Sequence, residues 1–188
     1  GASDAFALAD HQLAHVYVAR ADLVPEVKAT LEALPGVERV LDAEGKRAAG
    51  LDHPRSGELV AISRKDRWFS YYYWLDDERA PDFARTVEIH RKPGYDPVEL
   101  FLDPTLVLPA VQVGWRLLKK TAGLRTFMDV IPLDPSLVRG SHGRLADDPR
   151  EAPVFISSEA ELLPDGTVSA VDVKDLILRH VFANGGSA

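Results

Sequence analysis

The residue best placed for metal chemistry is His142, within the segment Gly-Ser-His-Gly-Arg at positions 140–144. A short apolar run at 153–156 follows it. Glycine lets the backbone approach a ligand closely, and loops at strand ends are frequent positions for functional side chains. Because the chain contains no cysteine, any metal would have to be held by His, Asp or Glu. The alternative is an ordinary histidine in a surface turn.

Asp10 and His11 could supply two further ligands, and His15 follows His11 by four residues. That spacing brings two side chains together on a helix. The run at 14–18, however, is rich in residues that favour strands, and side chains alternate between the two faces of a strand. The pattern therefore favours a polar entrance to a strand over a metal site.

A third group contains His90, Asp96 and Glu99, on either side of a Pro-Gly pair that indicates a turn. These side chains could meet across the turn as ligands, or they could simply hydrogen-bond a loop. His180 falls on the apolar side of a predicted helix, which is typical of a core histidine. His53 carries no pattern.

The sequence offers no recognisable nucleophile. It contains no Gly-x-Ser-x-Gly elbow, no His-Glu-x-x-His pair and no glycine-rich phosphate loop. Ser56, Ser141 and Ser157 have no base partner that the sequence reveals. The aromatic run at 68–74 could form a platform for substrate stacking, but aromatic strands more often lie in a core.

Several segments together resemble the alkaline phosphatase superfamily, in its type I phosphodiesterase/nucleotide pyrophosphatase branch. Arg-Ser-Gly-Glu-Leu-Val at 55–60 resembles the strand that closes the cap of that family. Gly-Ser-His-Gly at 140–143 resembles the returning metal-ligand loop, and 171–178 resembles the terminal helix. The segments at 10–18 and 90–97 are similar to features of a bacterial subgroup.

The resemblance implies that His142 is a metal ligand in an intact metal-dependent hydrolase, in which two metal ions, zinc above all, clamp a phosphate ester. A Ser or Thr alkoxide of the family attacks the ester, and water then clears the phospho-enzyme. That nucleophile and the first metal-binding Asp have no counterpart here. We therefore expect a cap and a C-terminal segment that are inactive alone, and metal binding by this chain alone stays open.

Two other functions remain as alternatives. One is a stand-alone α+β binding or interaction module without catalysis, and the other is an unrelated metal hydrolase that uses His90 or His11. The net charge of -7, from 22 basic and 29 acidic residues, argues against nucleic-acid and membrane partners. No apolar run approaches the roughly 20 residues of a membrane span, and no signal peptide is visible. The expected compartment is the cytoplasm.

The fold class that the pattern predicts is α+β. We expect a small ferredoxin-like α/β cap sandwich in residues 1–75, with strands at 14–18, 37–41, 57–63 and 68–74 and a helix at 22–34. Residues 76–188 would form a connector and C-terminal segment of a phosphatase-superfamily catalytic domain.

In that second region we expect an irregular stretch at 76–109, a helix at 108–122, and a short buried strand at 154–157. A helix after Ser169 would begin with a capping-box-like start and end at the Asn-Gly-Gly sequence of 184–186. His142 should lie on a loop, at least partly exposed. An apolar surface left uncovered near 154–156 would favour self-association.

Overall fold

The structure is a computed structural model that describes residues 3–87 and 97–182. It divides into two structural units, Gly1–Arg144 and Leu145–Ala188. The predicted boundary between residues 75 and 76 stays a prediction. His90, Asp96 and the predicted helix end at 184–186 lie outside the described residues.

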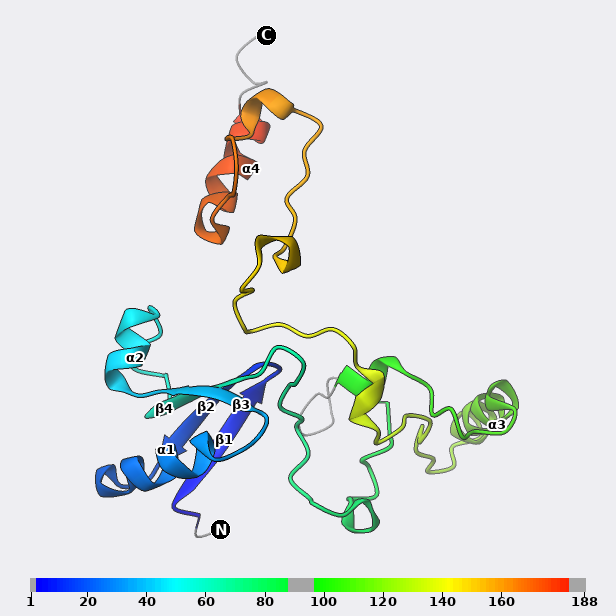
Figure 1. Ribbon diagram of the computed structural model, residues 1–188. Helices are drawn as coiled ribbons and strands as arrows, with labels where there is room; N and C mark the ends of the chain where they lie inside the picture. The colour runs from blue at the N-terminus through cyan, green and yellow to red at the C-terminus, as the bar shows by residue number, and fades with distance from the viewer. Residues whose placement is uncertain (1–2, 88–96, 183–188) are drawn as a thin grey trace. The chain divides into compact units, whose positions relative to one another are not determined.

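A four-stranded antiparallel sheet organises the first unit, with the strand order β1-β2-β4-β3 (Figure 1). In chain order its strands are β1 (Ala5–Asp10), β2 (Leu13–Val18), β3 (Val37–Leu41) and β4 (Leu59–Ser63). Since β4 lies between β2 and β3 and pairs with both, every residue of β4 is buried. The predicted α+β class is therefore confirmed, as are the strands predicted near 14–18, 37–41 and 57–63.

Helix α1 (Val24–Glu32) confirms the helix predicted at 22–34. Pro25 stands in its first turn, where the missing N–H costs nothing. The apolar side chains of α1 pack against a cluster of buried residues from the sheet. The buried members are Val16, Val18, Val37, Val40 and Leu59, and the partly buried residues packed against them include Leu23, Val24, Val27, Leu31 and Phe69. This cluster is the main hydrophobic core of the first unit.

The strand predicted at 68–74 is wrong, because these residues have no regular secondary structure. The fourth strand is instead β1, which pairs with β2 in a hairpin. The central strand β4 already has a neighbour on each side, so the chain that leaves Ser63 cannot extend the sheet beside it. The aromatic side chains pack on one another instead, with the rings of Tyr72 and Trp74 stacked 4.7 Å apart. β-Propensity reports a side chain's fit to a sheet surface and does not guarantee a sheet partner.

The rest of the first unit is mostly irregular, as the sequence predicts. Between residues 64 and 108 the described chain contains two short 3-10 turns, Asp77–Arg79 and Pro97–Leu100. One isolated bridge joins Thr86 to Asp129, and the side chains of Val98, Val130, Ile131 and Leu133 are buried. Helix α2 (Ala43–Ala48) precedes β4, and helix α3 (Pro109–Thr121) confirms the helix predicted at 108–122.

In the described part of the second unit, residues 145–182, there is one α-helix, α4 (Val173–Phe182), together with short 3-10 turns. The buried strand predicted at 154–157 is wrong, because the segment is irregular and Val154 and Ile156 are 79% and 86% exposed. The predicted side-chain cap is wrong as well, since Ser169 makes no capping hydrogen bond. Within the described residues, no helix is both long and apolar enough to cross a membrane.

Candidate metal centre

Asp10, His11 and His142 come together in the first unit, although more than 130 residues separate the first from the last. One ligand atom from each lies within 4.8 Å of the other two. The two imidazole rings stack with their centroids 4.1 Å apart. His142 is exposed on a loop, as the sequence predicts, and Asp10 is exposed at the end of β1. The interpretation of Asp10 and His11 as merely the entrance to a strand misses this convergence.

His11 occupies a strained position in the hairpin between β1 and β2. Asp10 pairs with Leu13, so His11 and Gln12 form a two-residue loop. The φ angle of His11 is 56°, in the region where such loops favour Gly, Asn or Asp. A side chain with a Cβ pays about 1–2 kcal/mol there. Strained residues persist where the surroundings hold them, and they gather at functional sites.

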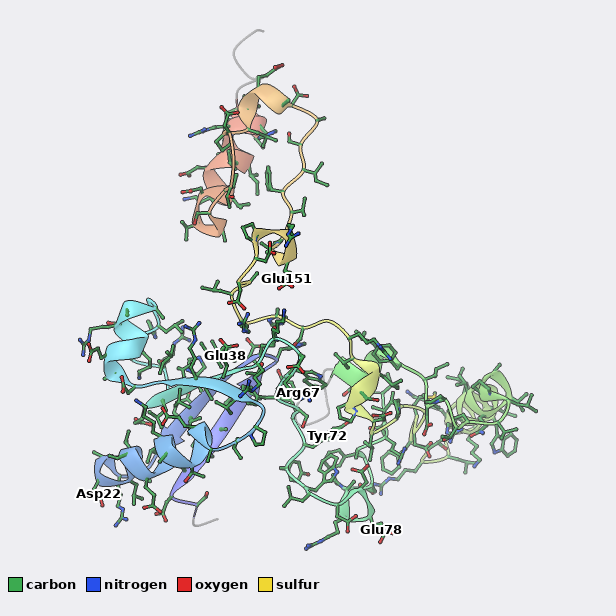
Figure 2. The ribbon with its side chains drawn as sticks, in the orientation of Figure 1. Asp22, Glu38, Arg67, Tyr72, Glu78 and Glu151 are labelled. Atoms are coloured by element: carbon green, nitrogen blue, oxygen red, sulfur yellow. The ribbon has the colours of Figure 1, made fainter. Side chains whose placement is uncertain are left out.

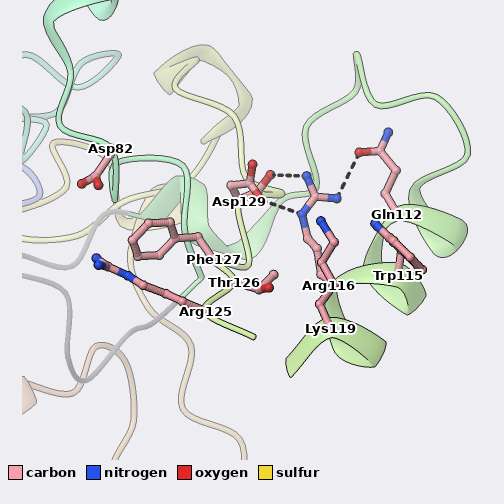
Figure 3. Close-up of a pocket in the computed structure, with 9 residues that line it drawn as sticks. All are labelled: Asp82, Gln112, Trp115, Arg116, Lys119, Arg125, Thr126, Phe127 and Asp129. Atoms are coloured by element: carbon pink, nitrogen blue, oxygen red, sulfur yellow. Dashed lines mark hydrogen bonds and ion pairs between the residues drawn. The ribbon is translucent and has the colours of Figure 1, made fainter. Parts of the chain in front are cut away.

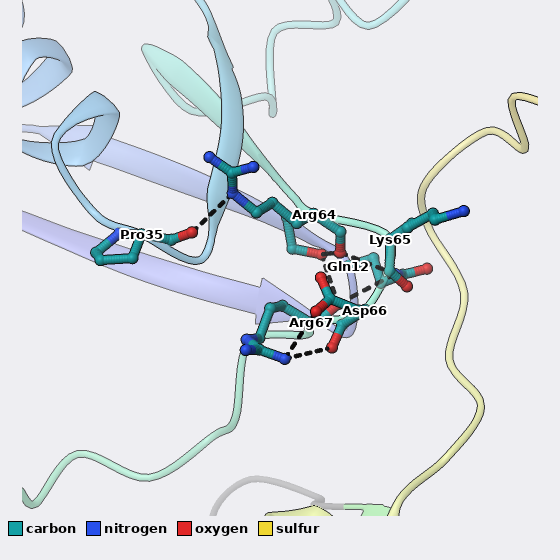
Figure 4. A network of polar contacts seen from close by, with 7 residues as sticks. Gln12, Pro35, Arg64, Lys65, Asp66 and Arg67 are labelled. Carbon is teal, nitrogen blue, oxygen red and sulfur yellow. Dashed lines mark hydrogen bonds and ion pairs between the residues drawn. The ribbon is translucent and has the colours of Figure 1, made fainter.

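Gln12 is the residue that holds this turn in place (Figure 4). Its buried side-chain amide lies 3.1–3.4 Å from the carbonyl oxygens of Arg64, Lys65 and Arg67, to which it donates. The His11 carbonyl in turn accepts a hydrogen bond of 2.7 Å from the amide of Phe69. The turn that carries Asp10 and His11 is therefore fixed by the chain that follows β4. The sequence gives no signal of this role for Gln12.

The loop that carries His142 lies directly against the same turn. The backbone N–H of Gln12 donates to the backbone carbonyl oxygen of His142 at 2.8 Å. Gly143 has a φ of 108°, and a Cβ there would lie 3.2 Å from the Leu13 amide nitrogen and 3.3 Å from the Asp10 carbonyl oxygen. Glycine is thus required both for the backbone angle and for the close approach. At Gly140, by contrast, a Cβ would meet nothing within 4 Å.

A part-buried ion pair anchors the end of this loop. The Nε of Arg144 lies 2.7 Å from a carboxylate oxygen of Glu38, and the Arg144 side chain is only 8% exposed. The register of β3 against β4 shifts between Val37 and Arg39, so Glu38 is the extra residue of a β-bulge. Bulges redirect side chains in this way. Figure 2 labels Glu38, which belongs to strand β3.

Ser141 hydrogen-bonds the His11 ring, with 2.9 Å between Ser141 Oγ and His11 Nδ1. The rings of Trp68 and His11 are tilted toward each other, with their centroids 6.3 Å apart. Histidines that bind metals usually have a hydrogen-bonding partner on the other ring nitrogen, which fixes the orientation of the ring. Ser141 stands in that position relative to His11.

The remaining sequence candidates lie elsewhere. His15 points to the loop before β4, where its Nδ1 lies 3.2 Å from Ser56 Oγ and accepts from the Gly57 amide. Since His15 does not join the cluster, the argument against a helical His11–His15 pair holds. Glu99 is buried, and its proposed partners His90 and Asp96 lie outside the described residues.

The sequence reveals no base partner for Ser56, Ser141 or Ser157, but in the structure each of them contacts a histidine. Ser56 contacts His15, Ser141 contacts His11, and Ser157 Oγ lies 2.5 Å from His180 Nε2 in the second unit. The Nδ1 of His180 lies 2.7 Å from the Leu176 carbonyl oxygen, to which it donates. Ser157 also accepts from the Glu159 amide, so this contact links α4 to the irregular segment before it.

The donor set suits a divalent transition metal. One carboxylate oxygen and two imidazole nitrogens are ligands that zinc favours, and three protein ligands with one open position are typical of catalytic zinc. Ligand atoms around tetrahedral zinc lie roughly 3.3 Å apart, given bond lengths near 2.0 Å. The present separations, up to 4.8 Å, are longer, and the stacked rings of His11 and His142 would have to rotate before both could face one ion. By ligand type, the three residues fit a metal of this kind.

A scan against protein-family models and searches of curated proteins and of solved structures found no match to this chain.

Proposed function

We propose that this chain is the cap and C-terminal segment of a metal-dependent phosphodiesterase or phosphatase-like hydrolase, and that it is inactive alone. The observation that carries the proposal is the convergence of Asp10, His11 and His142 within 4.8 Å. His142 is the residue that the resemblance to the phosphodiesterase/nucleotide pyrophosphatase branch singles out as a zinc ligand. A bound zinc ion would supply Lewis-acid stabilisation of a phosphate ester.

The chain's own residues have definable tasks in this proposal. Asp10, His11 and His142 would hold the metal, and Ser141 would orient the His11 ring so that Nε2 faces the ion. Gln12 and Gly143 keep the two ligand-bearing loops together. The sheet, with its β2-α1-β3 crossover and β4 between the two strands, would be a ferredoxin-like cap that shapes substrate choice.

Metal binding by the full chain tests the ligand set directly. We expect isothermal titration to detect about one zinc ion per chain, and the Co²⁺ form to show the absorption of a low-coordinate site. His142→Ala and His11→Ala should each abolish binding while circular dichroism stays unchanged. His53→Ala is the matched control, because His53 is exposed and lies outside the cluster. Zinc binding that survives both ligand substitutions would refute the assignment.

Activity assays test the absence of a nucleophile. We expect no hydrolysis of nitrophenyl phosphodiesters or monoesters by the chain, with zinc or manganese present, because removing part of a catalytic unit leaves little activity. Turnover on the order of 1 s⁻¹, typical of enzymes, would contradict the proposal. In an intact enzyme, His142→Ala should lose both metal and activity.

The alternative of a stand-alone binding module without catalysis predicts no stoichiometric zinc. The proposed partner of the intact enzyme is a phosphate-ester substrate, and the chain by itself would self-associate through its uncovered apolar surface, to which Val154 and Ile156 contribute. We propose the cytoplasm as its compartment, since a chain without cysteine needs no oxidising environment. Imaging of a tagged chain tests this.

A further inference from the structure

In the second unit, one serine and one histidine are placed as a nucleophile and its base. Ser157 Oγ lies 2.5 Å from His180 Nε2, although 23 positions separate the two residues in the chain. Ser157 belongs to the irregular segment before the 3-10 turn Ala160–Leu162, and His180 belongs to α4. A serine becomes a nucleophile when a base within hydrogen-bond reach can take its proton. The contact between Oγ and Nε2 meets this first requirement.

The imidazole of His180 is held in the tautomer that a general base needs. Its Nδ1 lies 2.7 Å from the carbonyl oxygen of Leu176, one turn earlier in α4. Because a carbonyl oxygen can only accept, Nδ1 carries the hydrogen, and Nε2 of the neutral ring is then an acceptor. A third group that orients the base in this way is the second feature of an activated serine.

The hydroxyl group of Ser157 is also restricted to one role. Its Oγ accepts a hydrogen bond of 3.0 Å from the backbone N–H of Glu159. A hydroxyl has a single hydrogen to donate, and Nε2 of His180 is the acceptor that lies against it. The Ser157 proton is therefore directed at the base, and the Glu159 N–H stabilises the negative charge that Oγ gains as the proton leaves.

The pair can be reached from solvent. The side chains of Ser157 and His180 are both half-buried. The ring of Phe155 lies edge-on to the His180 ring, with the centroids 6.4 Å apart and the planes at 68°, and Val154 and Ile156 are exposed beside it in the chain. A molecule with an apolar group that reaches Ser157 therefore meets apolar side chains in the same segment.

Two other hydroxyl groups show what this arrangement adds. Ser56 Oγ lies 3.2 Å from His15 Nδ1, but that nitrogen also accepts from the Gly57 amide at 3.3 Å, so the base is shared with a second donor. The hollow beside α3 contains the hydroxyl of Thr126, but none of the nine described residues that line it is a histidine (Figure 3). Neither hydroxyl has a base reserved for it, as Ser157 has.

From this geometry we propose that Ser157 and His180 form a nucleophile–base dyad that hydrolyses small activated carboxylic esters without a metal. In the first step Oγ bonds to the acyl carbon while its proton passes to Nε2. The bond from that carbon to the leaving oxygen breaks, and the leaving oxygen takes the proton. In the second step water gives a proton to Nε2 and its oxygen bonds to the acyl carbon. The bond to Oγ then breaks, Oγ recovers the proton, and the carboxylic acid is released.

The substrate class follows from the charge of the site. The acyl carbon of a carboxylic ester is uncharged and open to attack by Oγ, whereas transfer from an anionic phosphate ester calls for positive charge beside the phosphate. The dyad supplies a base and an N–H group, and neither carries such a charge. The proposal is therefore compatible with a chain that hydrolyses no phosphate ester.

The dyad does not rest on the proposed metal-dependent hydrolase. The three candidate metal ligands precede residue 145, whereas Ser157 and His180 follow it. His142→Ala should therefore lose zinc and keep the esterase activity, and Ser157→Ala should lose the esterase activity and keep zinc. These two variants distinguish failure of one proposal from failure of the other.

The test uses the full chain with a metal chelator present. We expect hydrolysis of 4-nitrophenyl acetate and labelling by diisopropyl fluorophosphate, in which Oγ bonds to phosphorus and fluoride leaves. Mass spectrometry should place the label on Ser157, and Ser157→Ala should abolish both reactions. His180→Ala should slow labelling by about 10²–10⁴-fold, the usual contribution of a general base, and added imidazole should restore part of the rate.

Three further variants complete the test. His180→Gln keeps an amide that can donate to the Leu176 carbonyl but is no base, so it should be as slow as His180→Ala even if the latter loosens α4. Ser158→Ala removes the exposed neighbouring serine, and Ser56→Ala removes the serine beside His15; both should react like the unmodified chain. Absence of labelling, labelling that survives Ser157→Ala, or an unchanged rate in His180→Gln would each overturn the proposal.

Discussion

At the scale of single residues, the candidate site depends on glycine as much as on its ligands. His142 can approach the β1–β2 turn only because the next residue, Gly143, lacks a Cβ. A second glycine, Gly57, is required for the same reason in the sheet. There the loop before β4 lies so close to the backbone of Val16 on β2 that a Cβ would not fit. Each position leads to a prediction with a matched glycine as its control.

Gly143→Ala should weaken zinc binding without unfolding the chain. The φ of 108° is strained for alanine, and the new methyl group would push against Leu13 and Asp10. The loop would move away and carry His142 from His11, so we expect a loss of zinc affinity on the order of 10–100-fold, comparable to other losses of ligand support. Titration calorimetry measures it. Gly140→Ala, with open space around its Cβ, should bind like the unmodified chain.

Gly57→Ala should instead destabilise the fold. Its Cβ would lie 2.5 Å from the carbonyl oxygen and 2.7 Å from the amide nitrogen of Val16, and these are backbone atoms in a central part of the sheet. Overpacking of this kind costs about 3 kcal/mol, measurable as a lower midpoint in urea unfolding. Gly36→Ala serves for comparison, since nothing lies within 4 Å of its Cβ and its effect should stay within about 0.5 kcal/mol. Equal effects of the two substitutions would contradict the assignment.

At the scale of secondary-structure elements, Asp42 links three of them. It caps α2 by accepting from the amides of Glu44 and Gly45, it follows β3, and it lies 2.6 Å from Lys28 Nζ on α1. The hydrogen bond from Lys28 is the main cause that lowers the pKa of Asp42 from 3.8 to about 2, and the Gly45 amide adds to it. The anchoring of α2 should therefore depend on acid pH.

Because the folded-state pKa is the lower one, the carboxylate stabilises the fold fully above about pH 4, and this contribution is lost as the pH falls toward 2. Asn caps helices as well as Asp does but cannot ionise. Asp42→Asn should therefore be less stable than the unmodified chain at neutral pH, and the difference should shrink between pH 4 and pH 2. Urea unfolding at several pH values measures it; a constant difference would show that the charge is not responsible.

At the scale of the whole molecule, the candidate metal centre belongs entirely to the first unit, because Asp10, His11 and His142 all precede residue 145. The second unit begins with an exposed segment, and the side chain of Arg150 is 89% exposed, whereas that of Arg144 is 8% exposed and paired with Glu38. The two units should thus be separable by protease without loss of the site.

Limited trypsin digestion should cut first at Arg150 and not at Arg144, and the fragment of residues 1–150 should keep its zinc affinity. Mass spectrometry identifies the cut and titration of the purified fragment measures the affinity. Arg150→Gln should suppress the first cleavage. A fragment that folds but binds no zinc would mean that the second unit supplies a ligand.

The sequence pattern by itself was enough to predict the helices and strands whose apolar side chains repeat at the spacing of a single buried face. The helical spacing of Val24, Val27 and Leu31 predicted α1, and the β-branched runs predicted β3 and β4, because each pattern reports a face that must be buried. His142 could be singled out from its glycine neighbours, and its exposure on a loop follows from the same residues. The α+β class followed from these elements.

Tertiary structure alone decided which segments pair and which side chains meet. The aromatic run at 68–74 has the composition of a strand, yet the weaker segment Ala5–Asp10 became the fourth strand because a two-residue loop joins it directly to β2, with which it pairs. Gln12 became an anchor, and Glu38 an ion-pair partner of Arg144, through contacts across more than 50 residues. The convergence of Asp10 and His11 with His142 likewise depends on contacts between segments far apart in the chain. The sequence specifies which side chains could bind a metal, but their distance in the chain does not tell how close they lie in space, because that distance is set only when the sheet and its loops have formed.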